Sequence, residues 1–444
     1  MTKNFNIELK NPLRLLAICL VILLVIINPG IYLETDPIYL YPKDITLKYL
    51  ILPSSIYVIY LTRRAIPEGM ALRLLLLLGI WLILVLILTK FASELWIGPS
   101  DRRDGVFSHL IYISVALAGL FVASSDTKLS QQNYRHLSVA AVAASLFAVS
   151  QQIGLLGVPG IDLPGTSATV AGGTLGNRGY MGGALALLLP LSIWLARNRP
   201  SLWSYAGLII VTWGLSATVT RGAWIAGLAG VCVLWITRQL TLKVILMLSA
   251  GIALSLAPAF FLPDAPMRSF SGSSPAAILT NNSGRTVLYR SALIGIAERP
   301  LLGWGGNALW KVMAERSDQE LLAEGGAPAH VRAERRDFGV NAPPSFILTL
   351  PSGEKQWFFL HVNKVHNEYL DYALTYGIPA AVLFTLLLGY GIWNAWTTAP
   401  VLSACLVAYG VYLLTWPEVI RFAPIAWFLL GLALAQRRGV TVET

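Results

Sequence analysis

The chain has 444 residues, of which 55% are hydrophobic and 13% are charged. Soluble proteins carry about 25% charged residues, so this composition excludes a soluble multidomain protein, a disordered chain and a disulfide scaffold. The formal net charge is +10. Because the basic residues lie mostly between apolar runs, we interpret them as determinants of membrane orientation and of contact with membrane lipids, not of nucleic-acid binding.

About twelve apolar runs approach the roughly 20 residues needed to cross a bilayer. They lie near residues 13–29, 47–62, 71–89, 106–124, 138–155, 181–196, 202–219, 222–237, 243–262, 375–395, 399–415 and 423–436. The sequence therefore predicts an all-α polytopic membrane protein with about twelve transmembrane helices.

Basic residues recur in every second connection between these runs, which predicts that those connections and both termini are cytoplasmic. They are Arg63, Arg64, Lys128, Arg135, Arg197, Arg199, Arg238, Lys243, Arg437 and Arg438. The alternate connections would be periplasmic, in a multi-pass protein of the bacterial inner membrane. Lys90, Arg102 and Arg103 depart from this pattern because they fall on the predicted outer side, and the sequence assigns them no role.

One connection is far longer than the others and divides the chain into three parts. Residues 1–262 form the first nine expected transmembrane helices, residues 263–365 a periplasmic cap, and residues 366–444 the last three helices and a cytoplasmic tail. A structureless loop as long as 263–365 would be unusual, so we expect it to fold.

Local patterns predict the elements of the cap. A helix should start after Asn281-Asn282-Ser283 and run to about Glu298, and a second should cover 307–324. Alternation around Pro351-Ser352-Gly353 predicts a hairpin of Phe346–Leu350 and Gln356–Leu360. An amphipathic helical run, 368–376, then leads into the next apolar segment.

Several chemistries are disfavoured by what the sequence lacks. None of the expected transmembrane runs contains Asp or Glu, which ion-coupled transporters usually need. Clustered carboxylates and phosphate-binding loop motifs are also missing, so we predict no metal and no cofactor. If the protein handles phosphate groups, its own cations must neutralise them.

Three arginines stand where a phosphate group could be bound. Arg178 ends Gly176-Asn177-Arg178, Arg221 lies in the short turn Thr220-Arg221-Gly222, and Arg285 follows Ser283-Gly284 at the start of the predicted cap helix. Free N–H groups at helix starts favour anions, and the arginine fork binds phosphate oxygens in pairs. The alternatives are interfacial anchors for Arg178 and Arg221 and a solvated helix residue for Arg285. Asn177 and Arg290 are secondary candidates.

Two of the five histidines, His361 and His366, lie where the cap meets the membrane. A neutral imidazole can take a proton from a hydroxyl group near neutral pH. His366, followed by Asn367 at a helix start, is the better candidate, whereas His361 and Asn367 are secondary. A structural role for each histidine remains the alternative, and a metal-binding pair is the least favoured.

These residues together resemble a known family. Ser283-Gly284-Arg285, the run Arg299–Asn307 and the run Val365–Leu370 are similar to the signature of the O-antigen ligase-like superfamily, and 176–178 and 220–222 resemble its upstream motifs. Its members are O-antigen ligases, O-antigen polymerases and protein O-oligosaccharyltransferases. The family often has a small or apolar residue and His before the His-Asn pair, where this chain has Lys364-Val365.

The resemblance implies a C-type glycosyltransferase-like fold and a transferase that needs neither nucleotide sugar nor metal. It implies transfer of a glycan from an undecaprenyl-diphosphate carrier, with His366 as the base and Arg178, Arg221 and Arg285 on the diphosphate. An O-antigen ligase would use lipid A-core as acceptor; a polymerase would use a second carrier glycan, and an oligosaccharyltransferase a protein. A lipid-linked glycan transporter is the alternative from another class.

Overall fold

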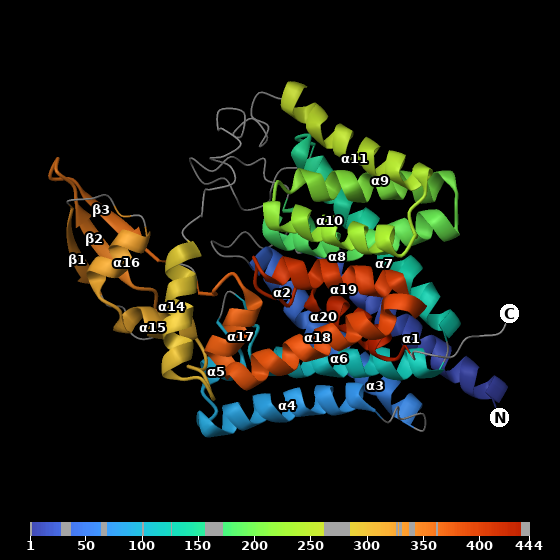
Figure 1. Cartoon of the computed structure of the whole chain (residues 1–444), viewed down its shortest axis with the longest axis horizontal. Helices are drawn as coiled ribbons and strands as arrows, with labels where there is room; N and C mark the ends of the chain where they lie inside the picture. The colour runs from blue at the N-terminus through green and yellow to red at the C-terminus, as the bar shows by residue number, and fades with distance from the viewer. Residues whose placement is uncertain are drawn as a thin grey trace.

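The structure is a computed structural model that describes residues 2–27, 37–63, 69–99, 102–125, 127–155, 172–261, 285–325, 327, 331–336, 342–360 and 363–436. In this part of the chain, apolar helices lie side by side in one bundle, and a smaller unit of helices and strands projects from one end (Figure 1). We call this unit the cap. His361 and the predicted helix start at 281–283 lie outside the described residues.

The bundle has a helix in each of the predicted apolar runs. Its elements are α1 (Thr2–Val25), α2 (Pro37–Ile45), the π-helix η1 (Thr46–Ile51), α3 (Leu52–Thr62), α4 (Met70–Leu88), α5 (Ser93–Trp96), α6 (Val106–Ser125), α7 (Thr127–Gln152), the 3-10 helix η3 (Gly173–Leu175), α8 (Arg178–Asn198), α9 (Leu202–Ala217), α10 (Arg221–Ile236), α11 (Leu242–Phe261), α17 (Glu368–Tyr376), α18 (Ile378–Thr398), α19 (Pro400–Leu413) and α20 (Ala423–Leu434). The helical prediction is therefore confirmed for these segments.

Five helical segments of the described chain are long and apolar enough to cross a membrane. They are Tyr39–Thr62, Met70–Leu88, Val106–Ser124, Arg178–Asn198 and Ile378–Thr398, and six further apolar helices are shorter. These segments and the low charge content define a helical membrane protein. The number of twelve crossings and the side of the membrane on which the cap lies remain predictions.

Small residues bring the central helices into close contact. A side chain at Gly431 of α20 would overlap the carbonyl group of Ala116 in α6, and one at Gly119 would lie 2.6 Å from the carbonyl oxygen of Phe428. Helices in a bilayer gain little from hydrophobic burial, so close backbone approach and van der Waals contact stabilise their association. This packing holds α6 and α20 together within the bundle.

The cap combines three helices with a small antiparallel sheet. It contains α14 (Arg285–Glu298), α15 (Ala308–Glu315), α16 (Asp318–Gly325), β1 (Arg332–Arg336), β2 (Ser345–Thr349) and β3 (Lys355–Phe359). The strand order is β1-β2-β3. Phe346 pairs with Phe358, which confirms the predicted hairpin, and the predicted α17 and the end of α14 are also confirmed.

Two predictions for the cap were wrong in detail. The single helix expected over 307–324 is two helices, because the chain leaves the helical conformation at Arg316, whose φ of −82° and ψ of 154° are extended. The cap prediction of helices plus a hairpin missed a third strand, β1, whose charged sequence Arg332–Arg336 lacks the apolar alternation of a strand. It is an edge strand of the sheet, where charged side chains are tolerated.

Candidate functional site

The first turns of α8 and α10 pack against the short segment that follows α19 and contains Thr415 and Trp416. A side chain at Gly179 would overlap the ring of Trp416, and one at Gly222 would overlap the hydroxyl group of Thr415. Each glycine directly follows an arginine that is the first residue of its helix, Arg178 or Arg221. The repeated Arg-Gly pair therefore lets two basic helix starts approach the same tryptophan.

Asn177 has a structural role at the start of α8. It is the N-cap, and its side-chain oxygen accepts a hydrogen bond of 2.8 Å from the backbone N–H of Gly179. Such a cap fixes where a helix begins. Asn177 thereby sets the position of the exposed Arg178, and the free N–H groups of the helix start add partial positive charge there.

His366 also lies next to Trp416. The centroids of the two rings are 5.2 Å apart. The Nδ1 atom of His366 is 3.2 Å from the carbonyl oxygen of Lys364. A carbonyl oxygen can only accept, so this contact assigns the proton to Nδ1 and leaves a lone pair on Nε2. The geometry thus gives His366 the tautomer that a general base needs at Nε2.

The backbone at His366 is strained, and the residues around it hold it in place. Its φ is 58°, in the left-handed region that residues other than glycine rarely adopt. The next residue, Asn367, caps α17 by accepting a hydrogen bond of 3.1 Å from the N–H of Leu370. Strained residues of this kind persist where surrounding contacts over-determine them, and they are concentrated at functional sites.

Helix α14 brings the cap to the same place. Tyr289 donates a hydrogen bond of 3.2 Å to the carbonyl oxygen of His366 and contacts that of Leu414 at 3.4 Å. Arg285 lies about one turn earlier on α14, so the start of this helix also faces His366. The helix starts that carry Arg178, Arg221 and Arg285 therefore converge near His366 and Trp416, and we call this region the Trp416 site.

Burial and positive charge keep His366 neutral. Burial is the main cause that lowers the pKa of His366 to about 4, and the charges of Arg102 and Arg285 lower it further. A group with that pKa is unprotonated near neutral pH and able to accept a proton. The effect of Arg102 places a cation beside His366 that the motifs did not identify.

Arg102 and Arg103 acquire roles that the sequence left open. The Nε atom of Arg102 donates a hydrogen bond of 2.6 Å to Asn363, three residues before His366. Arg103 forms an ion pair of 2.7 Å with Asp44. Arg102 therefore contacts the segment that carries His366, and its position on the predicted outer side was the sequence signal.

Arg290 faces away from this group. Its guanidinium group pairs with Glu324 of α16 at 2.6 Å, and Arg316 binds the same carboxylate at 2.8 Å. These contacts stabilise the packing of α14 on α16 within the cap. The structure therefore gives Arg290 a structural partner, whereas Arg285 faces His366.

A buried ionic network supports the segment that carries His366. The Nζ atom of Lys364 lies 2.7 Å from Asp371 and 3.5 Å from Asp104. Burial lowers the pKa of Lys364, but the carboxylates of Asp104 and Asp371 outweigh burial and raise that pKa well above its ordinary value. Lys364 is thus a charged structural residue. This gives a role to the position before the His-Asn pair at which the chain departs from the family pattern.

The same network joins α17 to the segment that carries Trp416. A side-chain oxygen of Glu368 accepts a hydrogen bond of 2.7 Å from the backbone N–H of Glu418. Glu418 in turn accepts hydrogen bonds from Tyr409 and, at 2.6 Å, from Trp427. Because Glu368 follows His366 by two residues and Glu418 follows Trp416 by two, these bonds fix the histidine relative to the tryptophan.

Three members of the network have the atom types of a metal site. Ligand atoms of His109, Glu368 and Glu418 lie within 4.8 Å of one another, and all three residues are buried. They are far apart in the sequence, which is why no spacing motif predicted them. The donor set would suit a divalent cation. Burial also raises the pKa of Glu418 above its ordinary value, so this carboxylate, 3.8 Å from Nε2 of His109, can bind a proton in place of a metal ion.

The fold and this site define a helical membrane protein with basic helix starts and one neutral histidine grouped beneath a cap. A family model described as O-antigen ligase matches residues 206–331, a segment that contains Arg221, Arg285 and Arg290. The matched segment is therefore similar to O-antigen ligases, in agreement with the resemblance of the signature residues. The family that this model describes consists of membrane enzymes that transfer glycans, so the match favours this class of activity. No curated protein matches the chain.

Proposed function

We propose that the protein is an O-antigen ligase of the bacterial inner membrane. It would transfer O-antigen glycan from undecaprenyl diphosphate to a sugar hydroxyl group of lipid A-core on the periplasmic side. The observation that carries this proposal is the convergence of the helix starts of Arg178, Arg221 and Arg285 near His366 and Trp416. The match to the O-antigen ligase model supports the class of reaction, and the site supports the assignment of roles.

The arginines would act on the leaving group. When the glycosidic bond breaks, negative charge develops on the lipid diphosphate. Guanidinium groups fixed at the starts of α8, α10 and α14 would stabilise that charge more in the transition state than in the ground state. The free N–H groups of these helix starts add to the same effect.

His366 would act on the acceptor. The acceptor oxygen attacks the anomeric carbon and forms the new C–O bond, while its proton passes to Nε2 of His366. The bond from the anomeric carbon to the diphosphate breaks, and its electron pair stays on the diphosphate. This single displacement inverts the anomeric configuration, and it needs neither a carboxylate nucleophile nor a metal.

An assay with three acceptors tests the proposed function. The purified full-length protein would be mixed with undecaprenyl-diphosphate glycan and with lipid A-core, a second carrier-linked glycan or a serine-containing peptide. We expect transfer to lipid A-core alone. Transfer to the second carrier glycan would identify a polymerase, and transfer to the peptide would identify a protein oligosaccharyltransferase. Movement of the donor across a bilayer without any transfer would identify a transporter.

A further inference from the structure

A second basic site lies at the end of the bundle opposite to the cap. Two cavities of about 710 and 700 Å³ adjoin there, since Arg135, Leu195 and Arg199 line both of them. Helix α8 has 21 residues and is therefore about 30 Å long, and it carries Arg178 at one end and Arg199 just past the other. This length matches the hydrocarbon core of a bilayer, so the two sites belong to opposite leaflets.

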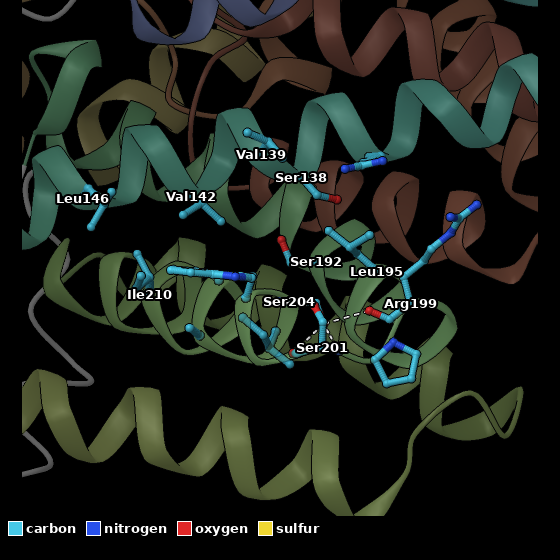
Figure 2. A pocket seen from close by; sticks show the side chains of 16 residues that line it. Ser138, Val139, Val142, Leu146, Ser192, Leu195, Arg199, Ser201, Ser204 and Ile210 are labelled. Atoms are coloured by element: carbon cyan, nitrogen blue, oxygen red, sulfur yellow. Dashed lines mark hydrogen bonds between the residues drawn. The ribbon is translucent and has the colours of Figure 1, made fainter.

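The larger cavity has an apolar wall between α7 and α9. Val139, Val142 and Leu146 of α7 face Ile210 of α9 across it (Figure 2). Gly207 permits the close approach, because a side chain there would lie 3.0 Å from Val142. The wall is open to the surface at Val139, which is 56% exposed. An apolar wall of this kind can bind an acyl chain.

The mouth of the cavities carries positive charge. Arg14, Arg135 and Arg199 are exposed there, and among the described residues that line either cavity there is no Asp or Glu. Trp203 is 84% exposed beside them, as expected of an interfacial tryptophan. The residues therefore offer a cationic end next to an apolar wall.

The turn that presents Arg199 is held by hydrogen bonds. Ser204 donates to the carbonyl oxygen of Arg199 at 2.9 Å, and Ser201 caps α9 by accepting from the N–H of Ser204 at 3.1 Å (Figure 2). The start of the 16-residue α9 thus lies beside Arg199 and adds the partial positive charge of a helix N-terminus. Arg135 reaches the same mouth from a different helix, α7.

We propose that this pocket binds an anionic glycerophospholipid of the leaflet opposite to the cap. Its phosphate group would lie between Arg135, Arg199 and the start of α9, with Arg14 at the outer edge. One acyl chain would lie along Val139, Val142 and Ile210. The cavity volume falls within the roughly 300–1,000 Å³ of small-molecule sites. This lipid site is separate from glycan transfer and does not depend on that function.

Lipid binding to the full-length purified protein tests the proposal. Phosphatidylglycerol is the probe, and native mass spectrometry or a fluorescent-lipid titration measures its affinity. A basic residue near an anionic lipid contributes about fivefold to affinity, so the double variant Arg135→Gln/Arg199→Gln should bind roughly thirtyfold more weakly. Val139→Trp, which fills the apolar wall and leaves the arginines in place, should also weaken binding.

Arg197→Gln is the matched control, because Arg197 is exposed two residues before Arg199 and lines neither cavity. Its affinity should stay within about twofold of the parent protein. Equal binding of phosphatidylethanolamine, tighter binding of undecaprenyl phosphate, displacement of the lipid by inorganic phosphate alone, or full affinity in the double variant would each overturn the proposal.

Discussion

The two ends of the bundle both carry arginines, but their surroundings differ. At the cap end, the helix starts that carry Arg178, Arg221 and Arg285 lie near the neutral His366 and the ring of Trp416. At the opposite end, Arg135 and Arg199 border an apolar pocket. Positive charge is thus common to both ends, and each also has a histidine, since His136 lines the smaller cavity. The cap end differs because the carbonyl oxygen of Lys364 orients the ring of His366.

The difference also extends to what holds each group in place. The cap-end histidine is fixed by a buried network in which Lys364 contacts Asp104 and Asp371. The opposite-end arginines are exposed, and their turn is held by hydrogen bonds of Ser201 and Ser204. A transfer site needs fixed geometry, whereas a lipid headgroup can be bound by adaptable surface cations.

Replacing His366 should have the largest effect on the transfer rate, because only the cap end is proposed to carry out glycan transfer. His366→Ala removes the proposed proton acceptor, so the transfer rate should fall by about 10²–10⁴-fold. Affinity for the undecaprenyl-diphosphate donor should change little, because the arginines remain. A single-turnover assay and a donor titration measure the two quantities separately. Full activity in this variant would remove His366 from the mechanism.

Replacing the cap-end arginines should have the next largest effect. Hydrogen bonds to charged groups contribute about 1.5–3 kcal/mol, so Arg221→Gln or Arg285→Gln should lower donor affinity and rate by roughly tenfold to a hundredfold. Arg332→Gln, an exposed residue of strand β1 in the cap, is the matched control and should behave as the parent protein does. Unchanged affinity for a diphosphate lipid in both site variants would contradict the clamp.

Replacing a glycine that follows one of the arginines should lower the transfer rate less than replacing the arginine does. The effect should be absent at a glycine outside the site. Gly222→Ala places a methyl group against Thr415 and would shift Arg221, so we expect a roughly tenfold lower transfer rate in a folded protein. Gly389→Ala is the control, because nothing lies within 4 Å of the added methyl group. Equal rates for the two variants would show that close packing at Trp416 is not needed.

Chelation should have the smallest effect. Because the proposed step uses arginines and His366, transfer should continue unchanged in EDTA, measured with the same assay. A loss of activity that added zinc or manganese restores would contradict the metal-independent mechanism. It would instead direct attention to the buried set of His109, Glu368 and Glu418.

Sequence reasoning was most successful where local patterns decide the structure. Apolar runs predicted the bundle helices, and the amphipathic run Glu368–Tyr376 predicted α17. Helix caps were less clear: Asn177 and Asn367 were considered as possible site residues, but both cap a helix. The charged strand β1 was missed because it has no local pattern and is defined by pairing with β2.

Only part of the candidate site could be predicted from the sequence, because contacts between residues far apart in the chain form the rest of it. The arginines and His366 stand in short motifs, so they could be named. Trp416 stands in no motif, and its position depends on packing against Gly179 and Gly222. Arg102 lies more than 250 residues before His366 in the chain, and only the fold brings its charge to that imidazole.

A structure with a bound donor analogue tests the grouping at Trp416 most directly. Electron cryomicroscopy with a non-transferable undecaprenyl-diphosphate glycan would locate the diphosphate. We predict phosphate oxygens within about 3.2 Å of the guanidinium groups of Arg178, Arg221 or Arg285, with the sugar next to Nε2 of His366. A diphosphate bound at the other end of the bundle, or in a space that His366 does not reach, would contradict the proposed transfer site.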